Sequence, residues 1–165
     1  MRALQSFVVT ASFIAAACSG PPIDLTKSLQ IDVVETGWYD SGIINGQNKL
    51  VPAAKIRVKN NSDQKLVQLQ INSLFRHGKD TEEWGSAFIT AAGSDGLAPG
   101  GTTRELLLKS QNGYTGSDQT RQDMLNNSQF VDARIQLFAK YGSIQWVRMG
   151  EVQIKRQLLE HEKGR

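Results

Sequence analysis

The sequence predicts an all-β protein, an antiparallel sandwich of about seven strands with one short helix. Three observations support this prediction. Apolar and polar residues alternate along most of the chain after residue 28, which is the pattern of strands with one buried face. Segments rich in Asn, Gly and Pro separate these runs. One remaining segment has the start signal of a helix. A small β-barrel is the alternative architecture.

Seven segments carry the strand pattern and are taken in chain order. They are residues 29–33, 54–59, 67–75, 84–90, 104–109, 131–141 and 144–155. The segment 131–141 is the clearest, because Ile135, Leu137 and other apolar residues alternate with charged or amide side chains. In 144–155 the alternation changes phase around Gly150, which predicts a β-bulge or a crossover between the sheets.

Residues 116–127 depart from the strand pattern. Thr120 and Asp123 have the spacing of a capping box, in which each residue satisfies a backbone group of the other. Met124 and Leu125 follow and supply an apolar face. We therefore expect one short helix that docks on the sandwich.

The N-terminus is organised like a secretory signal. Arg2 gives a positive start, residues 7–17 are uncharged and mostly apolar, and small residues precede Cys18. The apolar stretch is far shorter than the ~20 residues that a membrane-spanning helix needs. The Ala-Ala-Ala-Cys sequence of residues 15–18 resembles the lipobox of bacterial lipoproteins. This resemblance implies cleavage before Cys18, a diacylglyceryl group on its sulfur and an acylated amino terminus.

An ordinary signal-peptidase site is the alternative, because Ala15 and Ala17 also fit that rule. Lipidation is favoured because Cys18 is the only cysteine, and a secreted chain would otherwise begin with a lone thiol. Two or more acyl chains hold a protein stably on a membrane. In lipoproteins of hosts with two membranes, an aspartate directly after the lipidated cysteine causes retention in the inner membrane. Ser19 occupies this position here, so the resemblance implies the outer membrane, facing the periplasm.

We expect four parts along the chain: a lipoprotein signal peptide (1–17), a lipidated tether (18–28), the sandwich domain (29–157) and a charged tail (158–165). Loss of the signal peptide leaves about 148 of the 165 residues, enough for one domain with its own core. The net charge of +3 is small and argues against a dedicated nucleic-acid binder.

Three segments resemble the small immunoglobulin-like sandwiches of bacterial surface proteins, including the FxLYD type. Residues 56–62 form a strand that ends in an Asn-Ser turn, residues 66–75 form an amphipathic strand, and residues 97–100 hold a Pro-Gly turn. The FxLYD signature itself is absent, because Leu-Phe-Arg at 74–76 stands where Leu-Tyr-Asp is expected. The resemblance implies a fold and no active site.

Groups suited to catalysis or metal binding are few. A catalytic nucleophile needs a base and an orienting group, but the two histidines, His77 and His161, lie in a polar turn and a charged tail. Asp80, Glu82 and Glu83 follow His77 without the spacing of a calcium loop, so we interpret them as solvated charges. We expect no enzyme activity, no cofactor and no metal site.

Two groups of aromatic residues are candidate binding surfaces. Phe130, Phe138 and Trp146 would form an exposed partner patch if they shared an outer face. The alternative is that the short helix covers this face. A second group could form a carbohydrate platform or, equally, plug the ends of the sandwich. It comprises Trp38, Tyr39 and Trp84.

The sequence thus predicts a lipid-anchored cell-envelope module that binds an envelope protein or polysaccharide and is accessory to an envelope assembly. The alternative is a cell-wall carbohydrate-binding module or hydrolase. A concave pocket that joins aromatic residues to two carboxylates would favour the alternative, and a flat apolar patch at Phe138 and Trp146 would favour the binding module.

Overall fold

The computed structural model describes residues 23–142 and 145–159, and all structural statements below concern these residues. The predicted lipobox with Cys18 and the histidine at 161 lie outside them.

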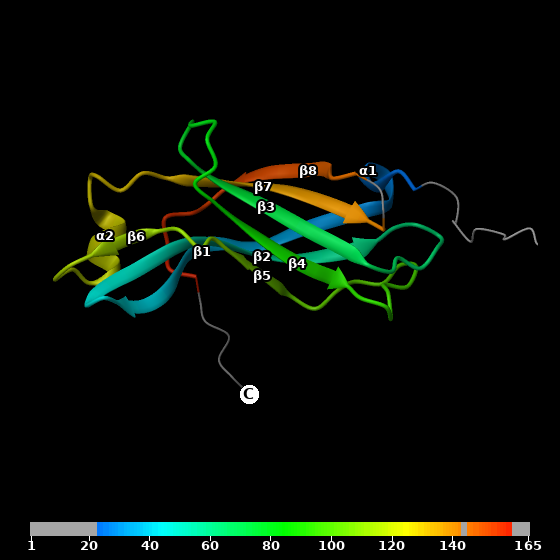
Figure 1. Ribbon diagram of the computed structural model, residues 1–165, viewed down its shortest axis with the longest axis horizontal. Coiled ribbons are helices and arrows are strands. Elements are labelled where there is room, and N and C mark those ends of the chain that lie inside the picture. Colours follow the sequence, from blue (N-terminus) through cyan, green and yellow to red (C-terminus); the bar gives the residue numbers. More distant parts are fainter. Residues whose placement is uncertain (1–22, 143–144, 160–165) are drawn as a thin grey trace, which may run out of the picture.

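The chain folds into two four-stranded antiparallel sheets that pack face to face (Figure 1). The first sheet contains β1 (Leu29–Ile44), β2 (Gln47–Asn60), β5 (Leu106–Lys109) and β6 (Tyr114–Gly116), with β1 on one side of β2 and the two short strands on the other. The second has the order β4 (Gly85–Ala92), β3 (Leu69–His77), β7 (Ala133–Tyr141) and β8 (Val147–Gln153). The predicted sandwich is confirmed. Both sheets are open, so the alternative of a closed barrel does not hold.

Within the described residues, two short helices accompany the sheets, one more than expected. The predicted helix is α2 (Arg121–Asn126), and its capping box is formed by Thr120 and Asp123. The unexpected helix is α1 (Leu25–Ser28), a single turn whose N-cap is Asp24. No helix among the described residues is long and apolar enough to cross a membrane.

The packed domain extends beyond the expected boundaries of 29–157 at both ends. Leu25 in α1 and Leu159 near the C-terminus are 1% and 2% exposed. The backbone N–H of Trp38 donates to the oxygen of Gln157, and the N–H of Leu159 donates to the oxygen of Trp38. β1 is the edge strand of its sheet, so its outer backbone groups can pair with the C-terminal segment.

The β1–β2 hairpin is much longer than the two strand segments predicted from the sequence. Its turn is formed by Asn45 and Gly46, whose φ angles of 51° and 77° suit a tight hairpin turn. Register shifts between Val33 and Glu35 and again after Asp40 interrupt the alternation of β1. The tip lies with α2 and β6 at one end of the molecule, and α1 lies at the other (Figure 1).

The expected irregularity near Gly150 is a β-bulge. Leu137 of β7 is opposite Gly150, and the next residue, Phe138, is opposite Arg148, so β8 has one extra residue at this point. The phase change in the sequence is therefore confirmed as a change of register.

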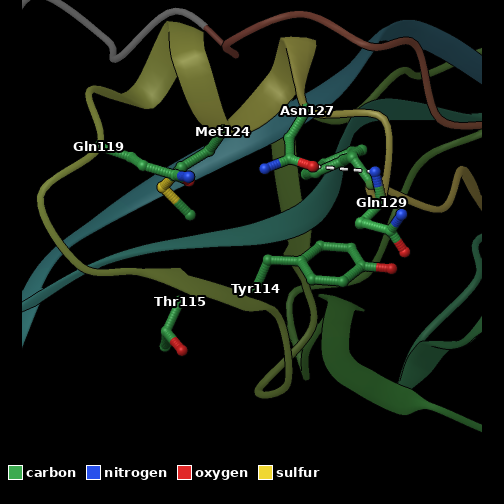
Figure 2. Close-up of a pocket in the computed structure, with 7 residues that line it drawn as sticks. Tyr114, Thr115, Gln119, Met124, Asn127 and Gln129 are labelled. Atoms are coloured by element: carbon green, nitrogen blue, oxygen red, sulfur yellow. Dashed lines mark hydrogen bonds between the residues drawn. The ribbon is translucent and has the colours of Figure 1, made fainter.

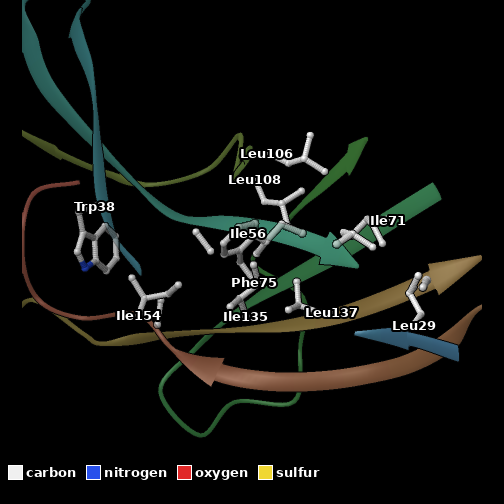
Figure 3. Close-up of a cluster of buried hydrophobic side chains, with 14 of the residues drawn as sticks. Leu29, Trp38, Ile56, Ile71, Phe75, Leu106, Leu108, Ile135, Leu137 and Ile154 are labelled. Carbon is white, nitrogen blue, oxygen red and sulfur yellow. The ribbon is translucent and has the colours of Figure 1, made fainter. Parts of the chain in front are cut away.

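The core lies between the inner faces of the two sheets (Figure 3). Alternate residues of β3 and β7 face it, as the burial patterns of both strands show. Its fully buried members include Ile56, Ile71, Phe75, Leu108 and Ile135. Trp38 lies at one end of this core (Figure 3) and has no exposed surface.

Candidate binding surfaces

The structure does not bring Trp38, Tyr39 and Trp84 together on the surface. Trp38 lies in the core, and its ring centroid is 6.1 Å from that of the half-buried Trp84. Tyr39 follows Trp38 in β1, so its side chain points to the opposite face of the sheet, where the Nζ of Lys109 is 4.4 Å from its ring. This group therefore does not form a carbohydrate platform on one surface. Trp38 and Trp84 instead fill the end of the sandwich, which was the other interpretation.

Trp38 belongs to an aromatic cluster that the sequence did not reveal. The ring of Phe130 meets it edge-on at 4.4 Å, and that of Tyr114 lies at 5.6 Å. The imidazole of His77 stacks on Trp84 at 3.8 Å. Phe130 is 6% exposed and thus belongs to this cluster and not to an outer patch.

The surroundings of the cluster shift two of its titrating groups. Burial lowers the pKa of His77 below its usual value, against a smaller opposing effect of the Asp80 carboxylate. Burial also raises the pKa of the Tyr114 phenol. Within the part of the chain that the structure describes, the Nε2 of His77 and the Nε1 of Trp38 are buried and have no hydrogen-bond partner.

The acidic residues after His77 do not form a metal site with it. The His77 ring packs into the aromatic cluster, and its Nε2 is buried. Within residues 23–142 and 145–159, no group of three or more His, Cys, Asp or Glu side chains is placed to hold a metal ion.

Phe138 and Trp146 do share an outer face, and Phe88 joins them there. Asn72 in β3 is flanked by Phe88 in β4 and by Phe138 in β7, so these three residues form one row across the sheet. Phe88 is 60% exposed and Trp146 is 39% exposed. Their rings meet edge-on at 6.1 Å. We call Phe88, Phe138 and Trp146 the outer-face patch.

The position of Trp146 determines the shape of this patch. Trp146 immediately precedes β8, whereas Phe88 lies in β4, and β3 and β7 separate these two strands. Neighbouring strands are about 4.8 Å apart, so a ring contact with Phe88 places the indole over the outer face of the strands between them. The Nζ of Lys140 lies 5.9 Å from the indole ring. The patch thus lies over the outer face of the second sheet.

A charged network borders the patch on β7 and β8. Glu151 forms ion pairs with Arg134 at 3.3 Å and with Arg148 at 3.0 Å. The amide of Gln136 donates to the same carboxylate at 2.6 Å. This hydrogen bond, followed by the arginine charges, lowers the pKa of Glu151. An apolar centre with a polar rim is the usual anatomy of a protein interface.

A pocket of about 210 Å³ opens between β6 and the segment that contains α2 (Figure 2). Its walls combine aromatic, thioether, hydroxyl and amide groups. The lining residues are Tyr114, Thr115, Gln119, Met124, Asn127, Gln129 and Phe130. None of the described residues that line this pocket carries a carboxylate, whereas a hydrolase of the glycosidase type uses two.

Two of the surface features were missed by sequence reasoning. Phe88 lies between Ala87 and Ile89, so the alternation of β4 does not show which residue faces outward. Tyr114 lies in β6, a strand of three residues that follows Gly113 and ends in Gly116, and two closely spaced glycines are typical of a turn in sequence. The exposed fraction of Phe88 and the pocket wall at Tyr114 became visible only in three dimensions.

No protein-family model and no curated protein matches this chain. Among solved structures, the chain is similar to the solution structure of AT1g01470 from Arabidopsis thaliana, with a TM-score of 0.48 and 15% sequence identity. The match covers 92% of this chain and 93% of that one. A likeness of this degree carries no argument about ligand or activity.

Proposed function

We propose that this chain is a lipid-anchored cell-envelope module that binds a protein partner through the outer-face patch. The observation that carries the proposal is the gathering of Phe88, Phe138 and Trp146 on one face of the second sheet. Large aromatic side chains that are grouped and exposed mark interaction sites more often than scattered ones do. Aromatic residues also supply much of the binding energy of protein interfaces.

The form of the patch favours a protein over a small ligand. Phe88 and Phe138 lie in one row of a sheet, which makes a broad surface, whereas small molecules bind in concave pockets. The charged residues around Glu151 would form a polar rim. We therefore expect the partner to present an apolar surface of similar breadth.

The anchor is proposed from the sequence, through the lipobox that ends at Cys18. An anchor at Cys18 would also orient the domain relative to the membrane. The described chain begins next to α1, and β1 then runs the length of the sandwich to the hairpin tip (Figure 1). A strand of 16 residues spans about 50 Å. Because α1 contacts β7 and β8, the strands next to Phe138 and Trp146, the outer-face patch would lie toward the membrane that holds Cys18.

The binding proposal is tested by removing the exposed aromatic rings. Phe88→Ser combined with Trp146→Ser should lower the yield of an in-cell crosslinked complex about tenfold or more, because aromatic anchors at interfaces contribute 2 kcal/mol or more. The matched control replaces Ile43 and Ile44, which are 67% and 45% exposed at the hairpin tip, with Ser. Equal yields from both double variants and the wild type would exclude the patch as the interface.

The anchor has a separate test. A fatty-acid probe in a host that processes lipoproteins should label the wild-type chain and not Cys18→Ser. Equal labelling of the two proteins would contradict lipidation at this residue and leave the binding proposal standing.

A further inference from the structure

We infer that the pocket between β6 and α2 binds one uncharged sugar residue. This site is distinct from the outer-face patch, because the two share no residue. The pocket lies at the end of the molecule that holds β6 and α2, away from α1 (Figure 1, Figure 2). The inference concerns ligand binding and is independent of whether the patch binds a protein.

The apolar wall of the pocket is rigid. The hydroxyl of Tyr114 accepts a hydrogen bond from the N–H of Val131 at 3.2 Å and donates to the oxygen of the same residue at 3.4 Å. The Tyr114 ring also packs against Phe130, with centroids 4.6 Å apart. The Tyr114 side chain, fixed in this way where it lines the pocket, offers a preformed aromatic surface for the C–H groups of a sugar ring, without a further cost of ordering the side chain.

The rim of the pocket supplies neutral hydrogen-bonding groups. Gln119, Asn127 and Gln129 contribute side-chain amides, each with donor and acceptor atoms, and Thr115 contributes a hydroxyl. The Oδ1 of Asn127 accepts from the backbone N–H of Gln129 at 2.8 Å, which fixes this amide (Figure 2). Sugar hydroxyls also both donate and accept, so amides complement them. Of the described residues that line the pocket, none has a charged side chain to balance an ionic ligand.

The volume limits the ligand to about one ring. Pockets for drug-sized molecules measure about 300–1,000 Å³, whereas a water molecule occupies about 30 Å³. The 210 Å³ found here lies between these limits. The Met124 thioether and Phe130 would contact an apolar substituent such as the methyl of an N-acetyl group. An N-acetylated uncharged hexose therefore matches the pocket in size and chemistry.

Gly116 keeps this space open. A Cβ at this position would lie 2.9 Å from the Cγ and Sδ of Met124 and 3.2 Å from the Oε1 of Gln119. Both side chains line the pocket, so an added methyl group would displace them.

The test is a titration of the full chain in detergent micelles with N-acetylglucosamine, followed by saturation-transfer NMR, with glucuronate as the charged comparison. We expect saturable binding of N-acetylglucosamine in the millimolar range and none of glucuronate. Gln129→Ala should weaken binding about fivefold, the equivalent of one hydrogen bond of about 1 kcal/mol. The matched control is Gln122→Ala, an exposed glutamine of α2 outside the pocket, which should bind as the wild type does.

Absence of saturable N-acetylglucosamine binding would overturn the inference, as would equal weakening by Gln129→Ala and Gln122→Ala. Tighter binding of glucuronate would also overturn it, because the pocket would then select a charge. The Phe88→Ser, Trp146→Ser variant should retain the sugar affinity, so that failure of the patch proposal and failure of this inference give different results.

Discussion

At the scale of single residues, Trp38 connects the sandwich core to the aromatic cluster. It has no exposed surface and contacts the rings of Phe130, Tyr114 and Trp84. We predict that Trp38→Ala lowers the free energy of unfolding by about 3–5 kcal/mol, since it leaves a large cavity. Trp146→Ala, which truncates an exposed tryptophan, should lower it by about 1 kcal/mol or less. Urea unfolding measures the change in the free energy of unfolding for both variants. Similar decreases for the two variants would contradict the assignment of Trp38 to the core.

His77 gives the fold a predicted dependence on pH. Burial lowers the pKa of His77 in the folded protein, so between the folded and unfolded pKa values the unfolded chain binds more protons. The contribution of His77 is therefore complete above about pH 6.5, the unfolded value, and is lost as the pH falls through the lower folded value.

The measurement compares the wild type with His77→Phe, which keeps a ring against Trp84 but does not titrate. The free energy of unfolding of the wild type relative to this variant should fall between pH 7.5 and pH 5. The histidine at position 161 is present in both proteins and cancels. A difference that is constant across this range would show that burial does not shift the His77 pKa.

The residues of the candidate surfaces show what the sequence pattern can determine. Phe130 and Phe138 have the same parity, and the sequence suggested one face for both. The regular strand β7 begins only at Ala133, so parity does not extend to Phe130, which turns into the core. Alternation predicts the face of a residue only inside a continuous strand.

At the scale of elements, the C-terminal segment stabilises the edge strand β1. Leu159 is 2% exposed, whereas its neighbour Leu158 is 39% exposed. We predict that Leu159→Ala lowers the free energy of unfolding by about 2–4 kcal/mol, while Leu158→Ala changes it by about 1 kcal/mol or less. Chemical denaturation of the two variants checks this. Equal effects would show that the segment does not pack on β1 as described.

Among the elements, those with a local signal were predicted well. The capping box at Thr120 and Asp123 and the phase change at Gly150 are short-range patterns, and both correspond to structural features. The length of β1 was not predictable, because two register shifts break its alternation. The helix α1 was also missed, since a single turn gives no periodic pattern.

At the scale of the whole molecule, the sandwich could be predicted because each sheet has one face in the core. Apolar and polar residues therefore alternate along its strands in the sequence. The pocket could not be predicted, because its walls come from β6, α2 and the turn before β7. These segments are brought together only by the packing of the sheets. The same holds for the outer-face patch, which joins β4, β7 and the residue before β8.

The proposal of a protein-binding face is tested most directly by a photo-crosslinking residue placed at Phe88 of the anchored chain in cells. The matched control is the same residue at Leu107, which is 37% exposed on β5 of the other sheet. We predict a discrete crosslinked protein species at position 88 that is absent at position 107 and is lost when Trp146→Ser is added. No adduct at position 88, or the same adducts at both positions, would contradict the proposal.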